Sequence, residues 1–450
     1  MGMVYIVHCI DTEGPLYEDK GVVFEQIKKI YGIEIENTET NYELLKKGLL
    51  DCGENTEGVK NLFRNHKVAT KGDWNEIDKM LKEITTYDFR HKLNDSEGRG
   101  WIYNWFCMDH VGFWGENPRK RDSGHHKIYD HYVAMVQEQN EGDFIGFHHH
   151  PVSVSGNYHD SGTAYWGRDT LNEILARKII DRDWFPSVYR PGFHTERPDS
   201  HWFLEQWIPF DYGNQATDYA DNEQIDLNGG RFGDWRYAPK EWVPYHPSHD
   251  NYQVKGTCHR WITRCLNMKA RVRELRQEDV NEAFKSASEG QDVILAFTDH
   301  DYKDMEEEID KVREMILNAS VRYREVRYIY SDALSAMRRV LKLQDEKIGL
   351  GMKLDFNIFP IRLIITAQKD IFGPQPFLAI KTKKGRYYWD NLDFMDKNQW
   401  SYTFDNNTFI YDDIEVIGVA SNNNYGETEI LRYDCLKKIY KRTELNVGRN

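Results

Sequence analysis

Short apolar runs alternate with longer amphipathic segments over much of the chain. This alternation is typical of parallel strands that are joined by crossover helices. Strands are expected at residues 4–10, 101–108, 144–148, 210–212, 293–297 and 326–330, with a further short strand that ends at Tyr189. Helices are expected at residues 74–85, 169–181, 277–289, 304–318 and 331–343. The pattern therefore predicts an α/β domain at residues 1–343.

The hydrophobic pattern changes near residue 352. From residue 353 to residue 450, short alternating segments are separated by Asn, Gly and Asp turns. Segments 362–367, 377–381, 401–404 and 414–419 fit the strands of an antiparallel sandwich. The aromatic side chains Tyr387, Tyr388, Trp389 and Trp400 can stack on sugar rings, although aromatics in a small sandwich more often form its core. We therefore predict a β-rich accessory domain at residues 353–450.

Composition and charge narrow the possible partners. The chain has 450 residues, is 40% hydrophobic and carries a net charge of −14. This charge argues against nucleic acid or an anionic membrane surface as the main partner. The six cysteines form no CxxC pair, which indicates reduced thiols and not zinc ligands. The N-terminal apolar run is too short for a signal peptide, and no apolar stretch reaches membrane-spanning length, so a cytoplasmic location is expected.

Three consecutive histidines close an apolar segment of the α/β region. They are His148, His149 and His150, which close an apolar run that indicates a buried strand, and Pro151 follows them directly. Because neighbouring side chains of a strand point to opposite faces, His148 and His150 are expected on one face and His149 on the other. Two imidazoles on one face can bind a divalent ion. The alternative is a polar loop with one buried core histidine.

Two carboxylates stand where the first strand ends. Asp11 and Glu13 lie two residues apart, directly before a turn at Gly14 and Pro15. Near a metal, one carboxylate can ligate while its neighbour acts as a general base. Without a metal, such a pair is more often a solvated loop or a helix cap.

Polar residues mark three later strand ends. Arg190 precedes Pro191 and can fix a carboxylate or a substrate oxygen, or it can form a purely structural corner. Asp211 lies at the next strand end. His300 follows an apolar run and stands beside Asp301, and a histidine paired with carboxylates can act as a general acid.

The order of these motifs resembles the polysaccharide deacetylase family, also called the NodB-homology family or carbohydrate esterase family 4. The resemblance covers about residues 3–340 and implies a distorted (β/α) barrel. Asp11 matches the family's aspartate base, and Glu13 matches its acidic metal ligand with one residue inserted. His148, in Gly-Phe-His, matches its first metal-binding histidine. The later motifs are matched, in order, by Arg190–Pro191, Asp211–Tyr212 and His300–Asp301.

Two departures from the family pattern affect the expected site. The family's second histidine falls four residues after His148, where this chain has Val152. We expect His150 to replace it, with His149 or His159 as alternatives. A long insertion between the first two motifs also places Asp109 at a strand end, where it can enter the site.

The resemblance implies a divalent metal ion, expected to be Zn²⁺, bound by Glu13, His148 and His150 with Asp11 as a further metal-binding residue. Asp11 is also expected to take a proton from water. The reaction so implied is removal of an N-acetyl or N-formyl group from an amino sugar or a sugar-linked precursor of a surface polysaccharide.

Four further residues have expected roles in this reaction. His300 is expected to protonate the leaving amine, oriented by Asp301 or Asp211, and Arg190 is expected to hold the base in place.

Two other interpretations of the sequence stay open. The first is a glycosidase or amidase on a related barrel, which would use two carboxylates without a metal. The second is a catalytically silent protein, which would bind a carbohydrate without catalysing a reaction.

Overall fold

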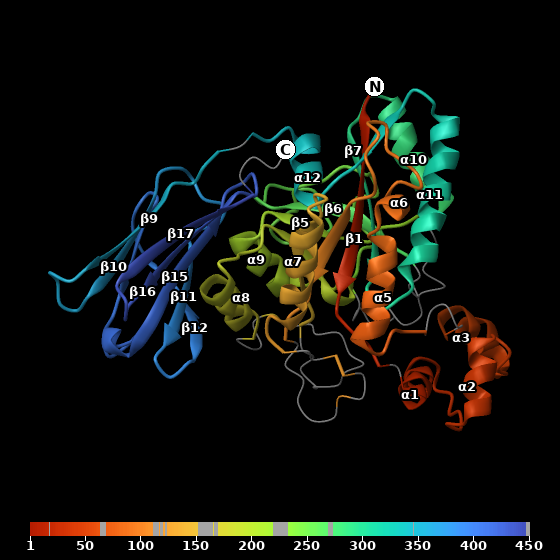
Figure 1. The fold of residues 1–450 in the computed structure, drawn as a ribbon, viewed down its shortest axis with the longest axis horizontal. Coiled ribbons are helices and arrows are strands. Elements are labelled where there is room, and N and C mark those ends of the chain that lie inside the picture. Colours follow the sequence, from red (N-terminus) through yellow and green to blue (C-terminus); the bar gives the residue numbers. More distant parts are fainter. Residues whose placement is uncertain are drawn as a thin grey trace.

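The computed structural model consists of a barrel with flanking helices and an antiparallel β region beside it (Figure 1). The residues that it describes are 1–17, 19–63, 69–110, 117, 120–121, 124–151, 165, 170–218, 233–268, 273–344 and 346–446.

A closed ring of seven parallel strands forms the barrel. Strand β1 pairs with β7 on one side and with β2 on the other, which closes the ring, and β8 pairs with the first residues of β1. The strands are β1 (Met3–Thr12), β2 (Tyr103–Cys107), β3 (Phe144–His149), β4 (Val188–Pro191), β5 (Phe210–Asn214), β6 (Trp261–Asn267), β7 (Val293–His300) and β8 (Arg327–Tyr330). Their carboxyl ends all lie at one end of the barrel, where parallel folds assemble their sites.

Helices connect and cover these strands. They are α5 (Trp74–Ile84), α6 (Tyr87–Arg90), α7 (Lys127–Gln139), α8 (Thr170–Arg182), α9 (Pro198–Trp207), α10 (Gln277–Ser288), α11 (Met305–Arg322) and α12 (Ala333–Leu341). Aspartates cap two of them: the side chain of Asp73 accepts a hydrogen bond at the start of α5, and Asp332 does the same at α12.

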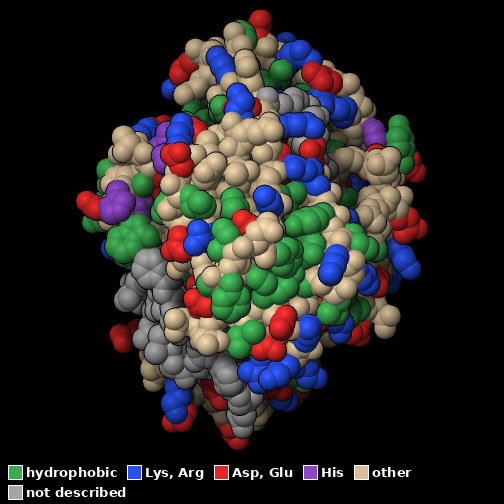
Figure 2. Space-filling model, turned by 90° about the vertical axis from the view of Figure 1, so that its left-hand side faces the viewer, with side chains coloured by type: hydrophobic (Ala, Val, Ile, Leu, Met, Phe, Trp, Pro, Cys, Tyr) green, Lys and Arg blue, Asp and Glu red, His purple; other side chains and the backbone are tan. Residues whose placement is uncertain are grey.

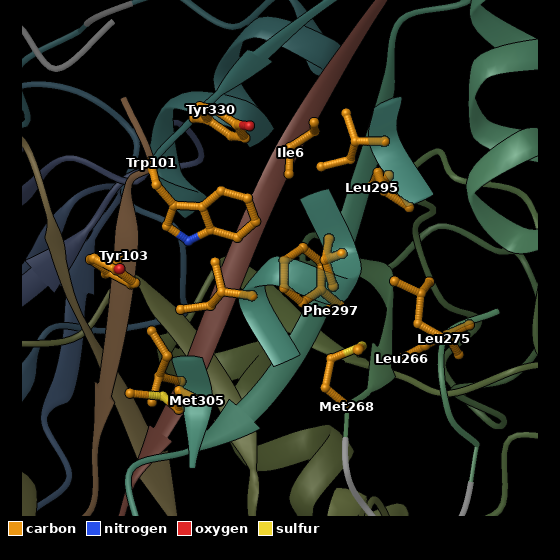
Figure 3. Close-up of a cluster of buried hydrophobic side chains, with 14 of the residues drawn as sticks. Ile6, Trp101, Tyr103, Leu266, Met268, Leu275, Leu295, Phe297, Met305 and Tyr330 are labelled. Carbon is orange, nitrogen blue, oxygen red and sulfur yellow. The ribbon is translucent and has the colours of Figure 1, made fainter. Parts of the chain in front are cut away.

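Alternation along β1 separates two hydrophobic cores. Tyr5 and Val7 join a cluster with other barrel strands and with α12, and this cluster fills the barrel interior. Ile6 and Ile10 point the other way and pack with the surrounding helices. Figure 3 shows part of this outer core, in which Phe297 of β7 lies near Trp101 and Leu266. The strand period of two thus decides which side chains can reach the barrel interior.

A small helical insertion follows β1. Its helices are α1 (Lys20–Tyr31), α2 (Glu39–Lys46) and α3 (Thr56–Phe63), and they enclose a hydrophobic cluster of their own. Figure 1 shows the insertion beyond the carboxyl end of β1.

The antiparallel region is a sandwich of two sheets. The strands β13 (Asp393–Asp396), β14 (Gln399–Thr403), β10 (Arg362–Ala367) and β9 (Leu350–Asp355) form one sheet in that order. The other sheet has the order β12 (Tyr387–Asp390), β11 (Phe377–Thr382), β15 (Ile414–Asn422), β16 (Thr428–Asp434) and β17 (Ile439–Leu445). Side chains from both sheets, including Leu363, Trp400 and Ile417, share one core.

Helix α8 joins the sandwich to the barrel. The outer face of the five-stranded sheet packs against α8 through Phe377, Ala379 and Val416. Gly418 of β15 leaves room for this contact, because a Cβ atom there would lie 2.7 Å from Ile179 of α8. The two regions therefore meet through close apolar packing.

The expected fold class is confirmed at the level of a parallel α/β barrel followed by an antiparallel β-sandwich. All five expected helices are present, with ends shifted by a few residues. Strand β6 was not expected, because Arg264 interrupts its apolar pattern; the structure buries this guanidinium against Asp279 at 2.8 Å. Among the described residues, no helix is both long and apolar enough to cross a bilayer.

We expect Phe297→Ala to lower the free energy of unfolding by about 3–5 kcal/mol, because it removes a fully buried ring from a packed core. Phe297 is 1% exposed and stacks on His8 with ring centroids 4.8 Å apart. Urea denaturation followed by circular dichroism measures the change. Phe356→Ala, which removes an exposed ring, is the control and should shift stability by no more than about 0.5 kcal/mol.

Candidate metal centre

Three metal-binding side chains converge where β1 and β3 end. Glu13 directly follows β1, His148 lies in β3, and His150 directly follows β3. Nε2 of His150 lies 2.9 Å from Nε2 of His148 and 3.0 Å from Oε1 of Glu13. Nε2 of His148 lies 3.7 Å from the same Oε1 atom. Among the described residues, these three form the group whose donor atoms are close enough to hold one metal ion.

The donor set fits a divalent metal in its chemistry and its spacing. Donors on a tetrahedral ion with bonds of about 2.0–2.1 Å lie about 3.3 Å apart, close to the separations found here. Metal ligation requires an ionised carboxylate and neutral imidazoles. Burial would raise the pKa of Glu13, but Arg121 and His150 hold it well below its usual range. Burial lowers the pKa of His150 to about 4, so this ring is neutral.

The backbone fixes the orientation of His148. Its Nδ1 atom lies 3.1 Å from the carbonyl oxygen of Arg190, so Nδ1–H donates there and the Nε2 lone pair faces the donor group. This arrangement is usual for metal-binding histidines, whose other ring nitrogen is held by a hydrogen bond.

His149 faces away from the donor group, as strand alternation predicts. Its ring lies against Phe147 and Tyr165, with centroids 6.2 Å and 5.7 Å away. Burial lowers its pKa to about 3. Val152 and the alternative ligand His159 lie outside the described residues.

Asp11 lies beside the donor group but pairs with an arginine. Its Oδ1 and Oδ2 accept hydrogen bonds from Nε and Nη2 of Arg190 at 2.6 Å and 2.9 Å. Burial would raise the pKa of Asp11, but Arg190 and His148 lower it well below its usual range. Asp11 is not one of the three residues whose donor atoms converge, but its Oδ1 atom lies 3.6 Å from Nδ1 of His148, so its expected metal binding stays a prediction.

Arg190 is itself held from several sides. Its Nη1 donates to the carbonyl oxygen of Tyr212 at 2.7 Å and lies 3.2 Å from Sγ of Cys265. Its Nη2 lies 3.2 Å from Nδ1 of His194. This position agrees with the expectation that Arg190 fixes the carboxylate of Asp11.

His300 and Asp301 lie in the site but do not act as a pair. Nε2 of His300 is 3.9 Å from Oδ2 of Asp11, and burial lowers the pKa of His300 to about 4. The carboxylate of Asp301 instead accepts from the backbone N–H groups of Glu13 and Gly14 and from the hydroxyl of Tyr132. Asp301 thus holds the turn that carries Glu13, and the expected role of orienting His300 is not its observed contact.

Asp211 belongs to another buried cluster. Its Oδ2 accepts from Arg260 at 2.8 Å, and Arg260 also pairs with Glu196. If both carboxyl groups were ionised, two of their oxygens would have no hydrogen-bond partner among the described residues: Oδ1 of Asp211 and Oε2 of Glu196. Burial and the neighbouring Asp211 raise the pKa of Glu196 well above its usual range. Asp211 therefore does not orient His300.

Asp109 also has a partner of its own. It lies 2.7 Å from the buried ammonium of Lys178 in α8 and 3.1 Å from Nδ1 of His125. Burial would raise the pKa of Asp109, but Lys178 lowers it. This ion pair links the end of β2 to the helix that supports the sandwich.

Arg121 is a site residue that the sequence did not reveal. Its Nη2 atom donates to Oε2 of Glu13 and lies 3.3 Å from Nε2 of His150. The two oxygens of the Glu13 carboxylate therefore have different neighbours: Oε1 faces the histidines and Oε2 faces Arg121. Arg121 stands in a charged loop with no recognisable motif, so no sequence signal pointed to it. His194 was also missed, although it lies only four residues after Arg190.

No family model matches the chain, and no curated protein matches it. Among solved structures, the chain is similar to an endo-beta-1,4-mannanase double mutant from Cellulomonas fimi. The sequence identity is 9%, the TM-score is 0.20, and the match covers 98% of this chain and 94% of the mannanase chain. A TM-score this low does not establish a shared fold, so the similarity carries no functional argument.

We expect Glu196→Gln to flatten the pH dependence of stability. In the folded protein the pKa of Glu196 is raised above its ordinary value of 4.5. A raised pKa means that the folded state holds the proton more tightly, so the wild type loses stability as the pH rises above 4.5 toward the folded pKa. A glutamine cannot ionise and should not show this loss.

Denaturant titrations of both proteins over a series of pH values measure this difference. Equal slopes for the wild type and Glu196→Gln would show that Glu196 is ionised in the folded state. Glu289→Gln is a suitable control, because this carboxylate is exposed and lies near Lys285 in α10, away from Arg260.

Proposed function

We propose that the barrel is a metal-dependent hydrolase that removes an N-acyl group from an amino sugar or a sugar-linked precursor. The observation that carries the proposal is the convergence of Glu13, His148 and His150 beside the arginine-held carboxylate of Asp11. The resemblance of the motif order to polysaccharide deacetylases supports the same chemistry, and the proposed barrel is of that family's type.

Zn²⁺ is the metal that we propose for this site. Two imidazoles and one carboxylate form a donor set found in catalytic zinc sites, which keep a further position open. When bound, such an ion supplies Lewis-acid polarisation of an acyl carbonyl and of water. Glu13, His148 and His150 would hold it.

Asp11 is proposed to accept a proton from water. Its pairing with Arg190 keeps the carboxylate ionised although it is buried. Each carboxylate oxygen has two lone pairs, so both oxygens can accept from Arg190 and still offer an acceptor site. Arg190 also prevents the carboxylate from turning away, because both of its contacts come from one rigid guanidinium.

His300 is proposed to deliver a proton to the leaving amine. Because burial keeps this ring neutral at pH 7, it must first receive the proton that it donates. Oδ2 of Asp11 lies 3.9 Å away and would carry a proton after the attack of water. A transfer from Asp11 through His300 to the amine therefore returns both groups to their starting states.

The contacts of Asp11 and Glu13 disfavour a metal-free glycosidase that uses these two residues as its pair of carboxylates. That chemistry needs one protonated and one free carboxylate on either side of a sugar bond. Here both Asp11 and Glu13 pair with arginines that keep them ionised. Neither is therefore suited to act as a general acid.

Metal analysis tests the proposal directly. We expect purified wild-type protein to bind close to one zinc per chain after metal loading and dialysis. His148→Ala and His150→Ala should each lose this metal, because each removes one of three donors. His149→Ala is the matched control and should keep it, since that ring faces away. Elemental analysis gives the metal content, and failure of the wild type to retain metal would contradict the proposed function.

Asp11→Asn separates catalysis from metal binding. We expect this variant to keep its metal while the rate of deacylation falls by about 10²–10⁴-fold, because asparagine cannot accept the proton. The assay measures amine released from a panel of N-acetylated and N-formylated amino sugars. Circular dichroism checks that the variant is folded. Full activity in Asp11→Asn would exclude this carboxylate as the base.

A further inference from the structure

Exposed apolar side chains concentrate on the sandwich. Nine of the eighteen large hydrophobic side chains that are exposed among the described residues belong to it. Figure 2 views the molecule from the sandwich side and shows hydrophobic side chains gathered on that face. Two of them, Phe394 and Met395 of β13, border a hollow.

Two hollows meet where the sandwich adjoins the barrel. The first has a volume of about 540 Å³, and its lining runs from His259 of the barrel to Phe394 and Trp400 of the sandwich. The second has a volume of about 490 Å³. Both hollows are lined by Asp370, Lys397, Asn398 and Asn424, so they are neighbours, and we call the two together the junction groove. Each half is within the size range of small-ligand pockets.

One wall of the junction groove is aromatic. Phe394 of β13 lies opposite Trp400 of β14 in the strand register, so their side chains share a face of the sheet. Phe394 is 70% exposed, whereas Trp400 is buried and its indole N–H donates to the carbonyl of Pro374. Phe372 also lines this wall, but its side chain is buried. Phe394 is therefore the aromatic ring that a ligand can reach, while the buried indole of Trp400 belongs to the core of the sandwich.

The charges on the other wall are largely paired. Lys397 lies 3.2 Å from Asp370, and Lys369 lies 2.8 Å from Glu346. The groove therefore presents no concentration of positive charge for a phosphate or a carboxylate. Besides these pairs, the lining includes the carboxylate of Asp396, the amide of Asn424, and the amide of Asn398, which donates to Asp370 at 3.0 Å. Amides and paired carboxylates can donate to and accept from hydroxyl groups.

The groove walls are anchored to both regions. The backbone N–H of Phe372 donates to the carbonyl of Asn422 at 2.8 Å. The neighbouring Gly373 lies so close to the backbone of Gln206 in α9 that a Cβ atom there would collide with it. The shape of the groove is thus set before any ligand arrives, which lowers the entropy cost of binding.

We propose that the junction groove binds an uncharged oligosaccharide. Sugar rings combine an apolar face, which stacks on aromatic rings, with a rim of hydroxyl groups, and the groove supplies a partner for each. Its two neighbouring hollows suit a chain of several sugars better than a single one. The proposal rests on residues of the sandwich and its border and does not depend on the metal centre. A glycan held there would raise the local concentration of sugar near the barrel.

The test is binding of uncharged and charged glycans to the full-length protein. A glycan array identifies binders, and isothermal titration calorimetry with chitotetraose, cellotetraose, maltotetraose and mannotetraose measures their affinity. We expect at least one neutral tetrasaccharide to bind, and Phe394→Ala and Asn424→Ala each to weaken that binding by about tenfold or more.

Matched controls lie at the other end of the sandwich. Phe356→Ala and Asn406→Ala remove an exposed phenyl ring and an exposed amide far from the groove along the strands, and they should leave affinity unchanged. His148→Ala should also bind the glycan normally, although it loses metal. This variant therefore distinguishes a failure of the groove from a failure of the metal centre.

Three results would overturn the proposal. One is the absence of binding to any neutral glycan on the array or in calorimetry. Another is binding that Phe394→Ala and Asn424→Ala leave unchanged. The third is binding of acidic glycans alone, which would show that charge and not stacking governs recognition.

Discussion

The site depends on one buried ion pair that crosses the barrel. Asp11 lies near the carboxyl end of β1 and Arg190 near that of β4, and these strands lie on opposite sides of the seven-stranded ring. A carboxylate inside a barrel is costly unless its charge is balanced, and loss of one partner of such a pair costs about 3–5 kcal/mol. The pair therefore ties the first strand to the fourth, and the neighbouring positions of Glu13, His148 and His300 follow from the same register. The contact that balances the charge of Asp11 therefore also fixes the geometry of the site.

Much of this arrangement was predictable because it follows from strand periodicity. The placement of His148 and His150 on one face needs only the period of two, and the meeting of Glu13 with these histidines needs only that parallel strands end at one edge. The confirmed α/β class has the same origin. The helix positions were also predictable, since the amphipathic pattern is strong in each expected segment.

What the sequence could not show are contacts between residues with no local signal. Arg121 reaches Glu13 from a loop whose pattern resembles any charged surface segment. Glu196 and Arg260 draw Asp211 into a separate cluster, although its position at a strand end suggested a catalytic role. Strand β6 was not predicted because a charged residue in the middle of a segment, here Arg264, indicates an exposed position unless its buried partner is known. In each case the partner is distant in sequence, and only the folded chain brings it near.

Helix α8 has a consequence for how such proteins can be rearranged. Lys178 of this helix pairs with Asp109 at the carboxyl end of the barrel strands, and Ile179 packs against the backbone of Gly418 in the sandwich. Consecutive residues of a single helix therefore serve two different neighbours. Exchange of the sandwich for an unrelated module would need a replacement that also lacks a side chain at this one point. The sandwich is therefore not freely interchangeable, because it must be kept together with helix α8, against which it packs.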